Sequence, residues 1–100
     1  MAVELIIAPE AADDVASAYA WYESRRPGLG EDFLGALDAT LEGIRRQPEM
    51  HTAVYKSYRR ALVRRFPYGV FYESSEATAI VYGVFHSSRD PQKWRERLPI

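Results

Sequence analysis

The chain of 100 residues contains no cysteine, which excludes disulfide bonds and thiolate metal sites. Its two histidines, His51 and His86, are not accompanied by carboxylates at the spacing of a metal-binding motif. The sequence also lacks a glycine-rich phosphate loop and the glycine-flanked serine of a hydrolase. No basic segment stands ahead of the short apolar run before Pro9, and no apolar run is long enough to span a membrane. These absences predict a soluble, cytoplasmic protein that needs no metal or other cofactor and has no membrane partner.

Charge is divided unevenly along the chain, although the net charge is only −1. Residues 1–50 contain four basic and ten acidic side chains, whereas residues 51–100 contain nine basic and four acidic ones. This division predicts a two-sided molecule in which a basic part meets an anionic partner. The alternative is that the two halves neutralise each other within the fold.

The first half of the chain has the pattern of one strand followed by two helices. Residues 3–7 are β-rich, and Pro9 then suits the first turn of a helix. Pro27 and Gly28 end this helix, and a second one runs from about Gly30 to Arg46. Apolar residues at helical spacing mark the buried stripe of each helix: Ala12, Val15, Tyr19 and Tyr22, then Phe33, Leu37, Leu41 and Ile44. The short link between the helices predicts an antiparallel hairpin.

The second half changes to the period of β-strands. Residues 59–66, 68–73 and 78–86 are rich in Val, Ile, Phe and Tyr, and the short links between them predict antiparallel neighbours. A short helix at residues 91–98 closes the chain. The predicted fold is a single α+β domain over residues 1–100, with the order β-α-α-β-β-β and a helical hairpin packed on a small, mainly antiparallel sheet.

Four arginines stand within the stretch "RRALVRRFPYGVFY" (59–72). Strand alternation assigns these residues to two faces: Arg60, Leu62, Arg64 and Phe66 on one, and Arg59, Ala61, Val63 and Arg65 on the other. Arginine suits phosphate and carboxylate partners. The alternative is a solvated sheet face whose arginines form ion pairs with the acidic helices.

The segment "FHSSRDPQKWRER" (85–97) adds further candidates. His86 could move a proton near neutral pH, or it could be structural at the end of its strand. Arg89 could bind an anion or brace Asp90. Trp94 is expected to be buried, since a chain of this size needs large apolar side chains in its core.

The ordered set of motifs resembles the toxins of the RelE/ParE superfamily of bacterial type II toxin–antitoxin systems. The resemblance covers almost the whole chain and is carried by "PEAADDVASAYAWY" (9–22), "RRPGLGEDFLGALDATLEGIRRQP" (25–48), "YRRALVRRFPYGVFYE" (58–73) and "VFHSSRDPQKWR" (84–95). It implies a toxin held inactive by a cognate antitoxin in a toxin–antitoxin hetero-oligomer.

The resemblance leaves the target open between two branches. RelE-like members are metal-independent endoribonucleases that cut mRNA on the ribosome, and their basic residues would correspond to Arg60, Arg64 or Arg65, His86 and Arg89. ParE-like members inhibit DNA gyrase without a catalytic set. The slightly negative net charge favours the ParE-like, non-enzymatic reading, because RNA binding on the ribosome calls for a strong positive field. A degenerate domain that serves only as the antitoxin's partner in repression is a third hypothesis.

Contacts with the antitoxin or the target are expected on two kinds of side chain. Trp21 and Leu34 are expected to face outward from the helical hairpin and to meet an extended or helical antitoxin segment. The predicted basic contacts are Arg59, Arg60, Arg64, Arg65 and Arg89, which would meet acidic residues of the antitoxin or the target.

Overall fold

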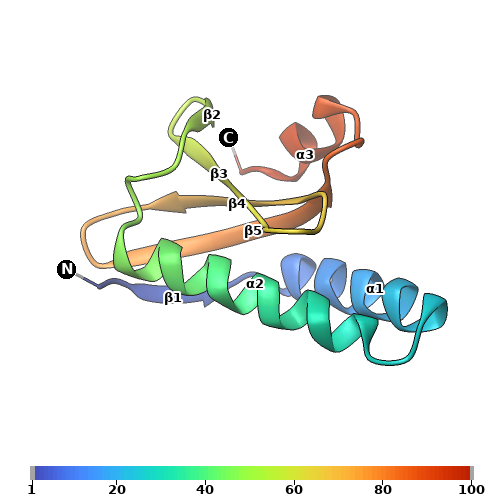
Figure 1. The fold of residues 1–100 in the computed structure, drawn as a ribbon. Helices are drawn as coiled ribbons and strands as arrows, with labels where there is room; N and C mark the ends of the chain where they lie inside the picture. The colour runs from blue at the N-terminus through green and yellow to red at the C-terminus, as the bar shows by residue number, and fades with distance from the viewer. Residues whose placement is uncertain (1, 100) are drawn as a thin grey trace.

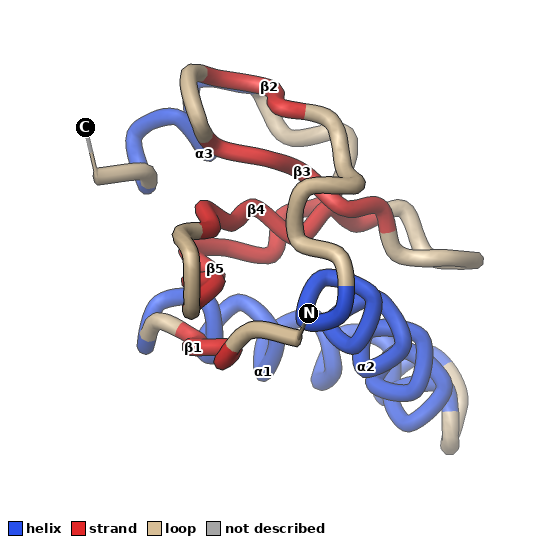
Figure 2. The backbone as a smooth tube through the Cα atoms, turned by 90° about the vertical axis from the view of Figure 1, so that its left-hand side faces the viewer, coloured by secondary structure: helices blue, strands red, loops and turns tan. Residues whose placement is uncertain are grey.

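A five-stranded sheet separates a helical hairpin from a short C-terminal helix (Figure 1). The computed structural model describes residues 2–99. Its elements are β1 (Glu4–Ile7), α1 (Pro9–Arg25), α2 (Leu29–Arg46), β2 (Ala53–Tyr55), β3 (Tyr58–Leu62), β4 (Tyr68–Ser74), β5 (Thr78–His86) and α3 (Pro91–Arg97). Helices α1 and α2 cover one face of the sheet and α3 covers the other (Figure 2). The α+β class and the helical hairpin on a small sheet are confirmed.

The strands lie in the order β1-β5-β4-β3-β2. Strands β2 to β5 are antiparallel neighbours, as expected from their short links. Strand β1 instead runs parallel to β5 and pairs Glu4 with Thr78 through Ile7 with Val81. The sheet is therefore mainly antiparallel, and β5 continues to His86 after β1 has ended.

The two helices are joined by a turn that the side chain of Glu23 stabilises. Gly28 adopts a left-handed conformation, with φ at 90°, which glycine reaches without a Cβ clash. The Glu23 carboxylate accepts hydrogen bonds from the N–H groups of Gly28 and Gly30, each with a contact of 3.0 Å. Gly28 is the N-cap residue and Gly30 lies in the first turn of α2, where N–H groups have no partner inside the helix. The predicted hairpin is thus confirmed, with its second helix starting at Leu29.

The buried stripe of α1 is shifted from the predicted one. Ala11, Ala18 and Tyr22 are buried, whereas the predicted Ala12 is exposed. The shift arises because alanines occur along most of α1 and do not by themselves define a face. The stripe of α2 lies closer to prediction, with Phe33, Leu37 and Ile44 buried against the sheet.

The predicted strand at residues 59–66 is wrong in its second half. Strand β3 ends at Leu62, and Arg65 adopts a positive φ of 71° in the turn that follows. The turn brings Phe66 to the helical side, where its ring lies 5.0 Å from that of Tyr22. Strict alternation would have kept Phe66 on the face of Arg60. Burial of a phenylalanine ring outweighs continuing the strand through residues 63–66.

Strand β2, only three residues long, was not predicted. It pairs with β3 through Ala53 and Arg59 and is joined to it by a tight turn in which Lys56 has a φ of 53°. Three residues are too few to show the alternation of apolar and polar side chains that predicts a strand. This strand is therefore recognised only by its pairing with β3.

Helix α3 covers the second face of the sheet with a smaller apolar cluster. The Trp94 ring stacks on that of Phe71 with their centroids 4.8 Å apart, and Leu98 is buried beside them. The Asp90 carboxylate caps the helix by accepting the Gln92 N–H at 2.9 Å. The prediction that Trp94 belongs to the core, and the predicted closing helix, are both confirmed.

Candidate functional site

Three of the sequence-predicted basic and titratable residues meet at one end of the sheet. Arg60, His86 and Arg89 line a shallow cleft beside Phe71 and Trp94; we call these three residues the cationic cleft. The space between them is about 20 Å³. Arg60 reaches the cleft by laying its aliphatic stem across Gly69, where a Cβ would stand 2.9 Å from the Arg60 Cδ. Gly69 therefore permits the position of this guanidinium.

His86 is held by the turn that follows β5. Its Nδ1 accepts the Ser88 N–H at 3.0 Å, and the Ser88 hydroxyl lies 2.8 Å from the same nitrogen. An Nδ1 that accepts a backbone N–H leaves the ring proton of the neutral imidazole on Nε2. The ring also stands edge-on to Tyr68, with their centroids 5.2 Å apart. These contacts fix the orientation of the His86 ring at the strand end.

The other three arginines lie away from the cationic cleft. Arg59 is on the opposite face of β3 and donates to the carbonyl oxygens of His51, at 2.6 Å, and Glu49, at 3.3 Å. Burial, and then the charge of Arg59, lower the pKa of His51. Arg64 and Arg65 instead line a broad depression beside α2, together with Glu31 and Asp32. Arg65 is therefore separated from the predicted nuclease set.

The arginines of the 59–72 stretch do not form ion pairs with the acidic helices among the described residues 2–99. The salt bridges there join Arg26 to Asp32, Arg45 and Arg46 to Glu42, and Arg97 to Asp14. The Glu42 carboxylate binds two guanidinium groups. Its hydrogen bonds with Arg45 are the largest cause of the lowering of the Glu42 pKa to about 2. Mutual neutralisation of the two halves is thus limited to the Arg97–Asp14 pair.

This pair ties α1, β5 and α3 together. The Arg97 guanidinium donates to both oxygens of the Asp14 carboxylate, at 2.8 and 3.2 Å. The same carboxylate accepts the Val84 N–H at 3.0 Å, and Arg97 also donates to the Tyr82 carbonyl at 3.3 Å. Both charged side chains are mostly buried. Four polar groups are therefore satisfied where helix and sheet edge meet.

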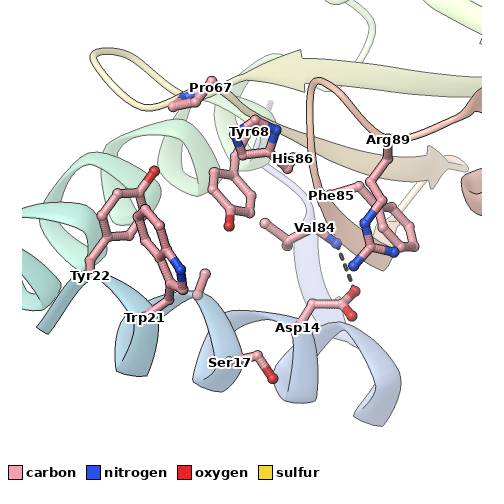
Figure 3. Close-up of a pocket in the computed structure, with 11 residues that line it drawn as sticks. Asp14, Ser17, Trp21, Tyr22, Pro67, Tyr68, Val84, Phe85, His86 and Arg89 are labelled. Atoms are coloured by element: carbon pink, nitrogen blue, oxygen red, sulfur yellow. Dashed lines mark hydrogen bonds between the residues drawn. The ribbon is translucent and has the colours of Figure 1, made fainter. Parts of the chain in front are cut away.

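A groove lies between α1 and the outer edge of β5, which we call the α1–β5 groove (Figure 3). It has a volume of about 530 Å³. Trp21, with 51% of its surface exposed, stands on one side and Arg89 on the other, and the Tyr68 hydroxyl points between them. Burial raises the pKa of Tyr68, although Arg89 acts in the opposite direction. The outward orientation expected for Trp21 is confirmed.

A second, apolar groove opens between the two helices, which we call the α1–α2 groove. It measures about 240 Å³ and is lined mostly by aliphatic side chains from α1, α2, β1 and β5, including Val15, Leu34 and Leu41. Asp38 is the one charged residue that lines it within the described part of the chain. The outward orientation expected for Leu34 is wrong, because its side chain is half-buried and packs on the core along this groove.

Both grooves escaped the sequence analysis because their walls come from distant segments. Asp14 and Val84, which meet in the α1–β5 groove, are 70 positions apart. Ile7 at the end of β1 lines the α1–α2 groove and is exposed, but a single exposed apolar residue is no signal of a binding surface and could not have found it. Among residues 2–99, no three His, Cys, Asp or Glu side chains gather as a metal site would require, and no helix is long and apolar enough to cross a membrane.

Comparison with known proteins first defines the fold and then the family. A solved structure described as the chromosomal ParDE TA system from P. aeruginosa superposes with a TM-score of 0.75 over 84% of this chain and 95% of that chain, at 11% sequence identity. At that identity the likeness establishes the fold. Among curated proteins, no sequence matches this chain.

The family follows from the sequence-family model for the ParE toxin of the type II toxin–antitoxin system, parDE, which matches residues 5–91. The chain belongs to this ParE toxin family. It is therefore the toxin of a toxin–antitoxin pair, and the ParE-like assignment within the RelE/ParE superfamily is confirmed.

Proposed function

We propose that this toxin arrests growth in the cytoplasm by binding and inhibiting DNA gyrase without catalysing a reaction, and that a cognate antitoxin neutralises it in a hetero-oligomer. Membership of the ParE toxin family is the main support, and the small size of the cationic cleft agrees with it. About 20 Å³ lies between Arg60, His86 and Arg89, whereas pockets that enclose small molecules measure several hundred Å³. A protein surface can contact the exposed side chains of Arg60 and Arg89 without entering the cleft.

The antitoxin would seat apolar side chains in the α1–α2 groove. Its walls present aliphatic carbon from both helices, and Ile7, with 38% of its surface exposed, borders its mouth. Burying this surface against an amphipathic segment is the driving force in helix-in-groove recognition. Asp38 on the rim would favour a basic residue at one end of that segment.

A metal-independent endoribonuclease acting on ribosome-bound mRNA is the second candidate. The observation that favours it is that Arg60, His86 and Arg89 share one cleft. In that case the arginines would stabilise negative charge developing on the scissile phosphate, and His86 would transfer a proton through Nε2, since Nδ1 is occupied by Ser88.

One pair of assays separates these candidates. Purified toxin is added to gyrase acting on relaxed plasmid and, in parallel, to a translating extract whose mRNA is mapped for cleavage. We expect loss of supercoiling with intact mRNA, and relief of the inhibition when the antitoxin is added. Cleaved mRNA with unimpaired supercoiling would instead establish the endoribonuclease.

A further inference from the structure

Strand β5 is longer than β1, and the difference leaves part of its outer edge open. The pairing with β1 ends where the Ala8 N–H donates to the Val81 carbonyl, while β5 runs on to His86. A β-bulge follows, because Phe71 pairs with Gly83 but Tyr72 pairs with Val81. Beyond the bulge, the backbone groups of Val84 and His86 face away from β4. An edge of this kind is where an added strand pairs.

Most of the outward-facing backbone groups are already used within the toxin. The Tyr82 carbonyl accepts from Arg97 and the Val84 N–H donates to Asp14. The His86 carbonyl accepts the Arg89 N–H at 3.0 Å. These contacts cap the edge on both sides of a short gap.

The gap consists of the Val84 carbonyl and the His86 N–H. The His86 N–H does not bond to β4, because the N–H of its partner Tyr68 donates to Phe66 and the Tyr68 carbonyl accepts from Val63. Backbone groups two residues apart on a strand face the same side, so the Val84 carbonyl also points away from β4. No other hydrogen bond among residues 2–99 reaches them. One acceptor and one donor thus face the α1–β5 groove, which Val84 and His86 line.

Their spacing suits one residue of an added parallel strand. In a parallel bridge, the residue opposite Phe85 donates its N–H to the carbonyl oxygen of residue 84. Its own carbonyl oxygen accepts a hydrogen bond from the N–H of residue 86. Those two groups are the Val84 carbonyl and the His86 N–H. The partner strand would continue, along β5, the parallel pairing with β1 that ends at Ile7.

Side-chain alternation then fixes what the partner must present. The Phe85 side chain belongs to the cluster under α3, so the side chain of the bridging residue points to that same face. Arg89 lies there, with its guanidinium carbon 5.8 Å from the centre of the Phe85 ring. The residues on either side of the bridging one point to the opposite face, toward Trp21 and Tyr68 (Figure 3).

We propose that the antitoxin inserts an extended segment with the pattern apolar–acidic–apolar into the α1–β5 groove. The acidic residue bridges to Phe85 and forms an ion pair with Arg89, while its apolar neighbours cover Trp21 and Tyr68. The proposal rests on the proposed function, since it names a second docking element of the same antitoxin. The segment would cover Arg89 and His86, two of the three residues of the cationic cleft. Neutralisation then follows from direct occlusion of the surface that meets the target.

The test follows the His86 amide and two pairs of variants. The probe is the protein encoded by the reading frame beside the toxin gene, titrated into ¹⁵N-labelled toxin. We expect hydrogen exchange of the His86 N–H to slow at least about tenfold in the complex, because the amide gains a partner. Arg89→Gln and Trp21→Ala should each weaken binding by about tenfold. Their matched controls, Lys93→Gln on α3 and Met50→Ala at another exposed apolar position, should bind as the wild type does.

Two failures can be distinguished. If the probe binds the wild-type toxin but leaves His86 exchange unchanged, or if the variants bind as tightly as their controls, the strand-addition proposal is overturned while the toxin–antitoxin pairing stands. If the probe does not bind the wild-type toxin at all, the proposed neutralisation by this antitoxin fails with it. Thermal unfolding of each variant establishes that the toxin is folded in every titration.

Discussion

The two faces of the sheet are covered to different depths. On one face, α1 and α2 bury a continuous core in which Phe33, Ile44 and Tyr72 are fully enclosed. On the other, the seven residues of α3 cover a smaller cluster around Phe71 and Trp94. The first face supplies most of the apolar burial and therefore most of the stability. Because fewer residues are buried on the second face, we expect it to open locally before the domain unfolds.

The largest expected effect is a difference in unfolding free energy between variants of the two apolar clusters. Phe33→Ala should lower the free energy of unfolding by about 4 kcal/mol, because a fully enclosed ring leaves a cavity that the helices cannot fill. Trp94→Ala should lower it by only about 2 kcal/mol, because α3 can shift into the space. Denaturant unfolding followed by circular dichroism measures both values. Equal losses would show that the faces do not differ in the way described.

The next effect concerns the contact that joins the two faces. Asp14→Asn should lower the free energy of unfolding by about 2 kcal/mol, since it breaks a mostly buried ion pair while leaving the packing intact. Asp13→Asn, at the exposed neighbouring position, is the control. Amide exchange should also rise in α3 of the Asp14 variant. Indistinguishable stabilities of the two variants would mean that the pair contributes little.

A smaller effect should appear at alkaline pH in the larger core. Burial raises the pKa of the Tyr72 hydroxyl to about 12 from an ordinary value of 10. Because the folded pKa is the higher one, its contribution is complete below pH 10 and is lost as the pH rises toward 12. Between pH 10 and 11 this loss should approach about 1 kcal/mol.

Tyr72→Phe should remove that part of the pH dependence, leaving a flatter curve of unfolding free energy against pH. Tyr58→Phe in the smaller core is the matched variant, because Tyr58 also donates its hydroxyl to a proline carbonyl, that of Pro99, as Tyr72 does to Pro48. Urea titrations at pH 9, 10 and 11 give the comparison. A pH profile unaltered by Tyr72→Phe would rule out the buried hydroxyl as its source.

The helical face could be predicted from the sequence more fully than the other. Its helices follow from local signals, namely Pro9 at the first turn, Gly28 in the left-handed turn and the spacing of Phe33, Leu37 and Ile44. The end of β3 could not be found in this way, because it depends on Phe66 reaching Tyr22 across the chain. Packing between distant segments overrides local alternation there.

The candidate site was predictable only residue by residue. The sequence singled out Arg60, His86 and Arg89, and the fold brings them to one cleft, but it separates Arg65 from them. The open edge of β5 could not be predicted from the sequence. It exists because β1 ends early and because β5 has a bulge whose pairing partners lie on β4. Such features depend on the register of the sheet, which the strand pattern alone does not determine.

The most direct test asks whether the α1–α2 groove serves antitoxin binding alone, while Arg60 in the cationic cleft serves inhibition of gyrase. Ala12→Gln fills the mouth of the α1–α2 groove from an exposed position of α1, and Ala16→Gln places the same side chain on the same helix outside it. Arg60→Gln removes a charge from the cationic cleft. Each variant is measured for antitoxin affinity by calorimetry and for inhibition of gyrase supercoiling.

We expect Ala12→Gln to weaken antitoxin binding by about tenfold or more while inhibiting gyrase as the wild type does, because only the groove is obstructed. Arg60→Gln should do the reverse, and Ala16→Gln should change neither quantity. A parallel loss of both activities in the folded Ala12 and Arg60 variants would contradict the assignment of the α1–α2 groove to the antitoxin alone and of Arg60 to the target alone.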